Sequence, residues 1–290
     1  MTWLIWAVIS SLCAAALAES NRIFKCDAQM LNAWRSTIAC GLMAVAFPYM
    51  EWPDSRYFYT VAVLDGIVTA IGMIMFFYLA AKKTGRVSSM ILPMAAFAAY
   101  MTWWMMRPME RPDIIENPFQ VLLAVLSFVL VCFSFQKLRS SDASWDSFLI
   151  VLPVGLSFGV IDAMTKDVLE GSYNTYKVIL SYTFLSLAVC TVTAWIAAIP
   201  KPLGGRPIKF WNGHLLWGSF WCGIWTVGMV LCGVFALSVA PNPSLPGLVM
   251  VLTPLWLFAL NSIRNIKDDV SIPSSILILL GSAGLLISTL

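Results

Sequence analysis

The sequence predicts an all-α membrane protein with ten transmembrane helices, arranged as two inverted five-helix repeats. Three observations lead to this prediction. The 290-residue chain is 60% hydrophobic and only 11% charged, which is outside the range of ordinary soluble domains. Apolar segments long enough to cross a hydrocarbon core of roughly 30 Å recur along the whole chain. Polar residues and prolines recur in one order in two halves, residues 1–140 and 141–290.

Five apolar segments of helical length fill the first half and are separated by polar or proline-rich connections. The third and fourth segments form a transmembrane hairpin around the basic turn Lys82–Arg86, because each limb is long enough to cross a bilayer. The predicted helices of this half cover about Thr2–Ala18, Met30–Pro48, Val61–Ala81, Val87–Met106 and Phe119–Phe135.

The second half repeats this plan after Lys137–Asp146, the most polar linker in the chain. A sharp turn at Pro241-Asn242-Pro243 separates its third and fourth segments. The predicted helices of this half cover about Phe148–Ala163, Tyr176–Ile199, Gly213–Val239, Leu245–Asn261 and Pro273–Thr289.

Matching residues in the two halves suggest that the five-helix unit is duplicated. An odd number of helices in each unit places the two units in opposite orientations, and a site is then expected near the middle of the membrane. The matched pairs are Asn21 with Asp162, Lys25 with Lys166, Arg35 with Lys177, and Pro93 with Pro254.

The third predicted helix carries an ionisable residue deep in an apolar segment. Asp65, Thr69 and Gly72 recur at i, i+4 and i+7, so they share one helix face, which we expect to avoid lipid. A carboxylate at that depth is costly unless it faces protein or a water-filled cavity. We therefore consider Asp65 either a cation or proton site, or a buried hydrogen-bonded group that only supports the fold.

Two bulky stripes are candidates for the wall of a cavity. In the fourth helix, methionines and aromatic residues share one face, while Ala95, Ala98 and Ala99 allow close helix packing. In the eighth helix, three tryptophans spaced by four residues could stack on a planar ligand or hold an organic cation. Packing and contact with lipid are the alternative roles. The cavity candidates beside Asp65 and Thr69 are Met94, Met101, Trp104, Trp217, Trp221 and Trp225.

Several charged or polar residues lie near predicted helix ends. Arg35 and Lys177 could extend their side chains to the membrane interface. Alternatively, they could form a pseudo-symmetric pair of positive groups for an anionic substrate. Glu19, Asn21 and Asp162 lie at a similar depth, and the two carboxylates could balance those charges.

Other classes of function lack their sequence signatures. The net charge of +3 is small and dispersed over loops, which argues against a nucleic-acid partner. The seven cysteines form no CxxC pair, and the single histidine belongs to no HExxH motif. We therefore expect no metal, no cofactor and no enzyme activity. A membrane scaffold or receptor that transports nothing remains the alternative to a transporter.

The arrangement resembles the drug/metabolite transporter superfamily, in particular its EamA-like branch. The residues that carry the likeness are Asn32–Ser36, Phe76–Met90 leading to Pro93, and Ala240–Ser244 leading to Thr253–Leu255.

This resemblance implies a ten-helix secondary transporter that works by alternating access, with a central cavity lined mainly by helices 1, 3, 4, 6, 8 and 9. It implies a small organic substrate such as an amino acid, an amine or a drug-like compound. The other expected partners are the lipid bilayer and a coupling proton or ion. The expected location is the bacterial inner (cell) membrane, spanned many times.

Overall fold

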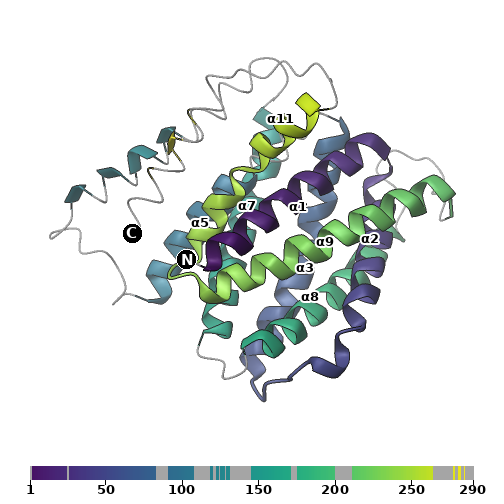
Figure 1. Cartoon of the computed structure of the whole chain (residues 1–290), viewed down its shortest axis with the longest axis horizontal. Coiled ribbons are helices and arrows are strands. Elements are labelled where there is room, and N and C mark those ends of the chain that lie inside the picture. Colours follow the sequence, from purple (N-terminus) through teal and green to yellow (C-terminus); the bar gives the residue numbers. More distant parts are fainter. Residues whose placement is uncertain are drawn as a thin grey trace.

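A computed structural model of the chain shows how its helices are arranged (Figure 1). The described residues are 2–24, 26–82, 91–107, 118–119, 122–123, 125–127, 129–130, 145–170, 175–199, 211–263, 277, 280–281 and 284. Their regular structure is entirely helical. The elements are α1 (Thr2–Phe24), α2 (Ala28–Ala44), the 3₁₀ turn η1 (Phe47–Tyr49), α3 (Arg56–Lys82), α5 (Ile91–Met106), α7 (Trp145–Leu169), α8 (Thr175–Ala198), α9 (Gly213–Val239), α10 (Ser244–Met250) and α11 (Thr253–Ile263).

Four helices of the described part are long and apolar enough to cross a membrane. They are Thr2–Ser20 of α1, Arg56–Tyr78 of α3, Thr175–Ala198 and Gly213–Val239. The prediction of an all-α protein is therefore confirmed for these residues, and its long apolar helices are compatible with an integral membrane protein. The count of ten stays a prediction, because most of the predicted fifth and tenth helices lies outside the described residues.

Two predicted polar connections are in fact helical. Helix α1 continues past Ala18 to Phe24, and α7 continues past Ala163 to Leu169. Polar residues did not end α7 because partners take up their polar groups: the hydroxyl of Thr165 is 2.6 Å from that of Tyr182. The predicted second helix is shorter than expected, since α2 ends at Ala44 and Pro48 lies in η1.

The predicted ninth helix is broken into two. Helix α10 ends at Met250 and α11 begins at Thr253. Pro254 explains the break, because proline has no N–H to donate to the carbonyl four residues earlier, that of Met250. The Thr253 hydroxyl donates to this carbonyl at 2.6 Å and satisfies it.

Helices α5 and α7 approach closely through small residues. A side chain at Gly159 of α7 would collide with the carbonyl of Ala95 and with Ala98 and Ala99, all on α5. Gly155, one turn earlier in α7, lies against the same helix. The predicted role of the α5 alanines in close packing is confirmed, and α7 supplies a GxxxG face for it.

The helices form a first group (α1, α2, α3, α5) and a second group (α7, α8, α9, α10 with α11), whose members correspond in this order. When a helix of the first group packs on a helix of the second, the two corresponding helices also pack on each other, and we call this an exchanged pair of contacts. Helix α1 packs on α9, and α7 packs on α3; α2 packs on α9, and α8 packs on α3. Helix α5 packs on α7, while α10 and α11 pack on α1. Two further contacts join corresponding helices, α2 with α8 and α5 with α10. Figure 1 shows α1 and α9 side by side among these neighbours.

Candidate functional site

A cavity of about 200 Å³ lies where helices of both groups meet. Residues of α1, α3, α5, α7, α8, α9, α10 and α11 line it. Most of its wall is apolar, with aromatic rings from Phe76 and Phe158 and a thioether from Met229. The polar groups that face it include two carboxylates and several hydroxyls. These residues are Ser10, Asp65, Thr69, Asp162, Thr165, Ser186 and Thr253.

Asp65 is held on the α3 side of the cavity by hydroxyl donors. Thr69, one turn later on α3, donates to Oδ1 at 3.1 Å, and Ser186 of α8 donates to Oδ2 at 2.7 Å. The Tyr182 hydroxyl is a further partner of this side chain. The predicted stripe of Asp65, Thr69 and Gly72 does face protein, since Gly72 packs against Phe158 of α7. Its hydroxyl donors fix the position of the Asp65 carboxyl without neutralising it.

Asp162 of α7 faces the same cavity as Asp65 but differs from it in its hydrogen-bond partners. It makes no hydrogen bond or ion pair with any residue that the structure describes. It lies close enough to Asp65 for their charges to interact. The structure therefore brings together Asp65, Thr69 and Asp162 from the predicted set, and leaves one carboxylate free to accept hydrogen bonds.

Arg35 does not reach the membrane interface, so that prediction was wrong. Its side chain is 0% exposed and lies among α2, α3, α8 and α9. Nη1 donates to Thr226 Oγ1 at 2.8 Å and Nη2 donates to Asn32 Oδ1 at 2.6 Å. The guanidinium also lies over the Phe77 ring, 5.6 Å from its centroid. No carboxylate of the described residues forms an ion pair with it, and it does not line the cavity.

The predicted match of Arg35 with Lys177 is also wrong. Arg35 is the eighth residue of α2, whereas Lys177 is the third of α8 and lies at the start of that helix. Tyr182 is the eighth residue of α8. Each of these eighth residues contacts a polar group of a neighbouring helix: Arg35 contacts Thr226 of α9, and Tyr182 contacts Asp65 of α3.

The polar side of α8 was not predicted from the sequence. Tyr182, Ser186 and Cys190 are spaced by four residues, so they share one helix face. Tyr182 and Ser186 contact Asp65, and Cys190 Sγ lies 3.9 Å from Nη2 of Arg35. The i, i+4, i+8 spacing was the signal that could have revealed this face.

A short sequence repeat was missed as well. Residues 65–69 read Asp-Gly-Ile-Val-Thr, and residues 222–226 read Cys-Gly-Ile-Trp-Thr. The two segments lie at matching positions, each starting at the tenth residue of α3 or α9. Gly66 packs against α8 and Gly223 packs against α2. Thr69 then contacts Asp65, whereas Thr226 contacts Arg35. The repeat therefore places an acidic centre and a basic centre at corresponding positions.

The predicted aromatic wall does not line this cavity. Trp217 is 56% exposed and Trp221 is 37% exposed on the outer surface of α9, where Phe220 stacks with Trp217. Trp225 packs against a core cluster that includes Leu17. We correct the prediction: α9 faces the cavity one to two turns further on, with Met229 and Gly233.

The methionine and tryptophan face of α5 lies elsewhere too. Met94 packs against Gly155 of α7, Met101 is 44% exposed, and Trp104 contacts Tyr100 with ring centroids 4.2 Å apart. Helix α5 lines the cavity instead with Ile91, Leu92 and Ala95. The start of α5, rather than its methionine and tryptophan face, thus approaches the site.

The remaining candidates are Glu19, Lys177 and Asn21. Glu19 is buried near the end of α1, and Lys177 is half-buried. Asn21 lies within α1, with its side chain outside the described part. Neither Glu19 nor Lys177 lines the cavity.

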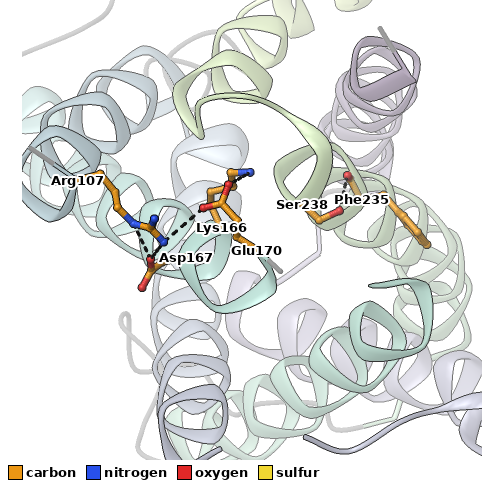
Figure 2. A network of polar contacts seen from close by, with 6 residues as sticks. All are labelled: Arg107, Lys166, Asp167, Glu170, Phe235 and Ser238. Atoms are coloured by element: carbon orange, nitrogen blue, oxygen red, sulfur yellow. Dashed lines mark hydrogen bonds and ion pairs between the residues drawn. The ribbon is translucent and has the colours of Figure 1, made fainter. Parts of the chain in front are cut away.

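An ion-pair network lies beside the cavity at the end of α7 (Figure 2). Arg107, which follows α5, contacts Asp167 at 2.7 Å and Glu170 at 3.4 Å. The buried Lys166 pairs with Glu170 at 3.1 Å. Because Thr165 lines the cavity and Lys166 follows it, this network ties α5 to α7 next to the site.

Comparison with known proteins shows the fold. The sequence matches no family model, and it matches no curated protein. The structure matches 28 chains of solved structures. One of them, described only as a "Crystal structure of protein", has a TM-score of 0.67 at 12% sequence identity. The match covers 99% of this chain and 98% of that chain. At this identity the likeness shows that the two chains share their helix arrangement over nearly their full length.

Proposed function

We propose that the chain is a secondary transporter that moves a small organic metabolite across a membrane by alternating access. In this proposal it is an EamA-like member of the drug/metabolite transporter superfamily. Residues 1–140 and 141–290 form two inverted five-helix repeats, and the protein crosses the bacterial inner membrane ten times.

The observation that carries this proposal is the position of the cavity. Helices of both groups line it, and two carboxylates, Asp65 and Asp162, face it from opposite groups. Burying ionisable groups in an apolar bundle is costly, so such groups mark candidate ion or substrate paths. A scaffold has no need of them. The lining also includes every helix that the family resemblance implies. It includes in addition α8, which is the predicted seventh helix.

Two features of the helices support an inverted repeat. The contacts exchange between the two groups, as expected for units related by a two-fold axis in the membrane plane. The segments at residues 65–69 and 222–226 also occupy corresponding places in α3 and α9. In addition, the break between α10 and α11 lies beside the cavity, where transporters commonly use discontinuous helices.

The test begins with a comparison of metabolites in cells with and without the protein. Compounds that change are then tested for uptake into liposomes that contain the purified chain. A transporter moves at least one of them faster than empty liposomes do. If none moves although the protein is folded and inserted, the proposal fails and the scaffold or receptor alternative takes its place.

A further inference from the structure

We propose that the cavity binds a small organic monocation, a protonated amine, whose ammonium group sits between Asp162 and Asp65. This inference deepens the proposed function and rests on it, because it names the class of substrate that the transporter would carry. Three properties of the cavity support it: the charge of its lining, the unused hydrogen-bond acceptor capacity of Asp162, and its size.

The described lining of the cavity has acidic groups but no basic ones. Among the described residues that line it, the ionisable side chains are Asp65 and Asp162, and none is a lysine, arginine or histidine. The buried Arg35 lies outside the lining, and Lys166 is paired with Glu170. Two carboxylates in a low-dielectric site either take up protons or need a positive counter-charge. The ligand is therefore expected to supply it.

The two carboxylates differ in how many further hydrogen bonds they can accept. Both oxygens of Asp65 already receive hydroxyl hydrogen bonds, from Thr69 and Ser186. Asp162 receives none from the described residues. A carboxylate can accept about four hydrogen bonds, and those from a charged donor are the strongest. An ammonium group with three N–H donors fits the free capacity of Asp162, with Asp65 as a second, already positioned neighbour.

The rest of the cavity suits an apolar body. At about 30 Å³ of liquid volume per water, 200 Å³ corresponds to roughly seven waters. Aromatic and thioether groups of Phe76, Phe158 and Met229 face this space. A bare sodium ion would leave most of the apolar wall in contact with water. An amine of comparable volume would cover this wall and place its charge at one end.

The test uses ligands that differ in charge but hardly in shape. Binding of 2-phenylethylamine to the purified full-length protein is measured by titration calorimetry, beside neutral 2-phenylethanol and anionic phenylacetate. We expect the amine to bind about tenfold or more tightly than the alcohol, and phenylacetate to bind more weakly than both. These comparisons use the unaltered chain, so they do not depend on whether a variant folds.

A substitution then assigns the contact. Asp162→Asn keeps the shape and removes the charge, so amine affinity should fall about tenfold or more while alcohol affinity stays within about twofold. Asp54→Asn is the matched control, because Asp54 is exposed before α3 and should change neither affinity. Thermal unfolding of each variant shows whether it is folded.

Three results would overturn the inference: equal binding of amine and alcohol, full amine affinity in the folded Asp162→Asn variant, or no amine binding at all. The last result, together with proton uptake that Asp162→Asn abolishes, would make the carboxylates a proton site only. Liposome flux separates this inference from the proposed function. Flux of other compounds without amine binding refutes only the cation site, whereas amine binding without any flux refutes only transport.

Discussion

Arg35 shows how a buried charged residue can be hydrogen-bonded in part without being neutralised, because its Nη atoms have partners while its buried Nε has none among the described residues. Its guanidinium is fully buried and hydrogen-bonded to Thr226 and Asn32, yet no described carboxylate pairs with it. A planar guanidinium spreads its charge and presents donors in a fixed fork, which suits this set of neutral partners. A lysine ammonium would be a compact charge with fewer of these contacts.

This difference leads to a prediction for two substitutions at Arg35. Arg35→Lys should lower the free energy of unfolding by about 3 kcal/mol, because it keeps a buried charge and loses the fork. Arg35→Met should cost only about 1 kcal/mol or less, since it removes the charge and retains apolar volume. Thermal or denaturant unfolding in detergent measures both. A lysine variant more stable than the methionine variant would contradict this account of the site.

The hydroxyl on α8 that holds Asp65 gives a second prediction. Ser186→Ala removes the 2.7 Å hydrogen bond to Asp65 and should cost about 1–3 kcal/mol of unfolding free energy. Ser157→Ala is its control, because that exposed hydroxyl bonds only the carbonyl of Pro153 in its own helix. The control should stay within about 0.5 kcal/mol. Equal costs at both positions would mean that the Asp65 contact has no special weight.

At the scale of elements, the contact of α5 with α7 depends on the absence of side chains. Gly159→Ala would push a methyl group into the Ala95 carbonyl, so we expect a loss of about 1–3 kcal/mol or failure to fold. Gly41→Ala makes the same change inside α2, where nothing lies within 4 Å of the added carbon. It should stabilise by about 0.5–1 kcal/mol. Unfolding midpoints of the two variants should therefore move in opposite directions.

Helices that are long apolar runs between polar turns could be predicted from the sequence. Helix ends that depend on contacts with neighbouring helices could not. The bounds of α9 are those expected, Gly213–Val239, because a long apolar run lies between two polar turns. The ends of α1 and α7 were predicted too early, since the sequence does not show that neighbouring helices bury the polar residues there. The break before Pro254 could have been foreseen from the proline itself.

The candidate site was predictable only in part, because the sequence shows the pattern within a helix but not the packing between helices. Depth in an apolar helix singled out Asp65, and its spacing to Thr69 placed both on one face. Which face of α9 meets the cavity depends on packing between helices, and the tryptophan stripe of residues 217–225 gave a misleading answer. The contribution of α8 was missed because Tyr182, Ser186 and Cys190 look unremarkable until their partners are known.

At the scale of the whole molecule, the exchanged helix contacts place the cavity where both groups meet. If the two groups rock against each other, the cavity opens first to one side of the membrane and then to the other. Its lining residues would remain the same in both states. Access from two sides is thus the central claim of this account.

Cysteine labelling tests that claim most directly. Ser10→Cys, in a chain whose seven native cysteines are replaced, places one thiol in the cavity wall. A membrane-impermeant maleimide is applied to sealed vesicles of each orientation, and the exposed Asp54→Cys serves as the control that reports one side only. Alternating access predicts that the thiol at position 10 reacts in vesicles of both orientations. Reaction from one side under every condition, or from neither, would contradict it.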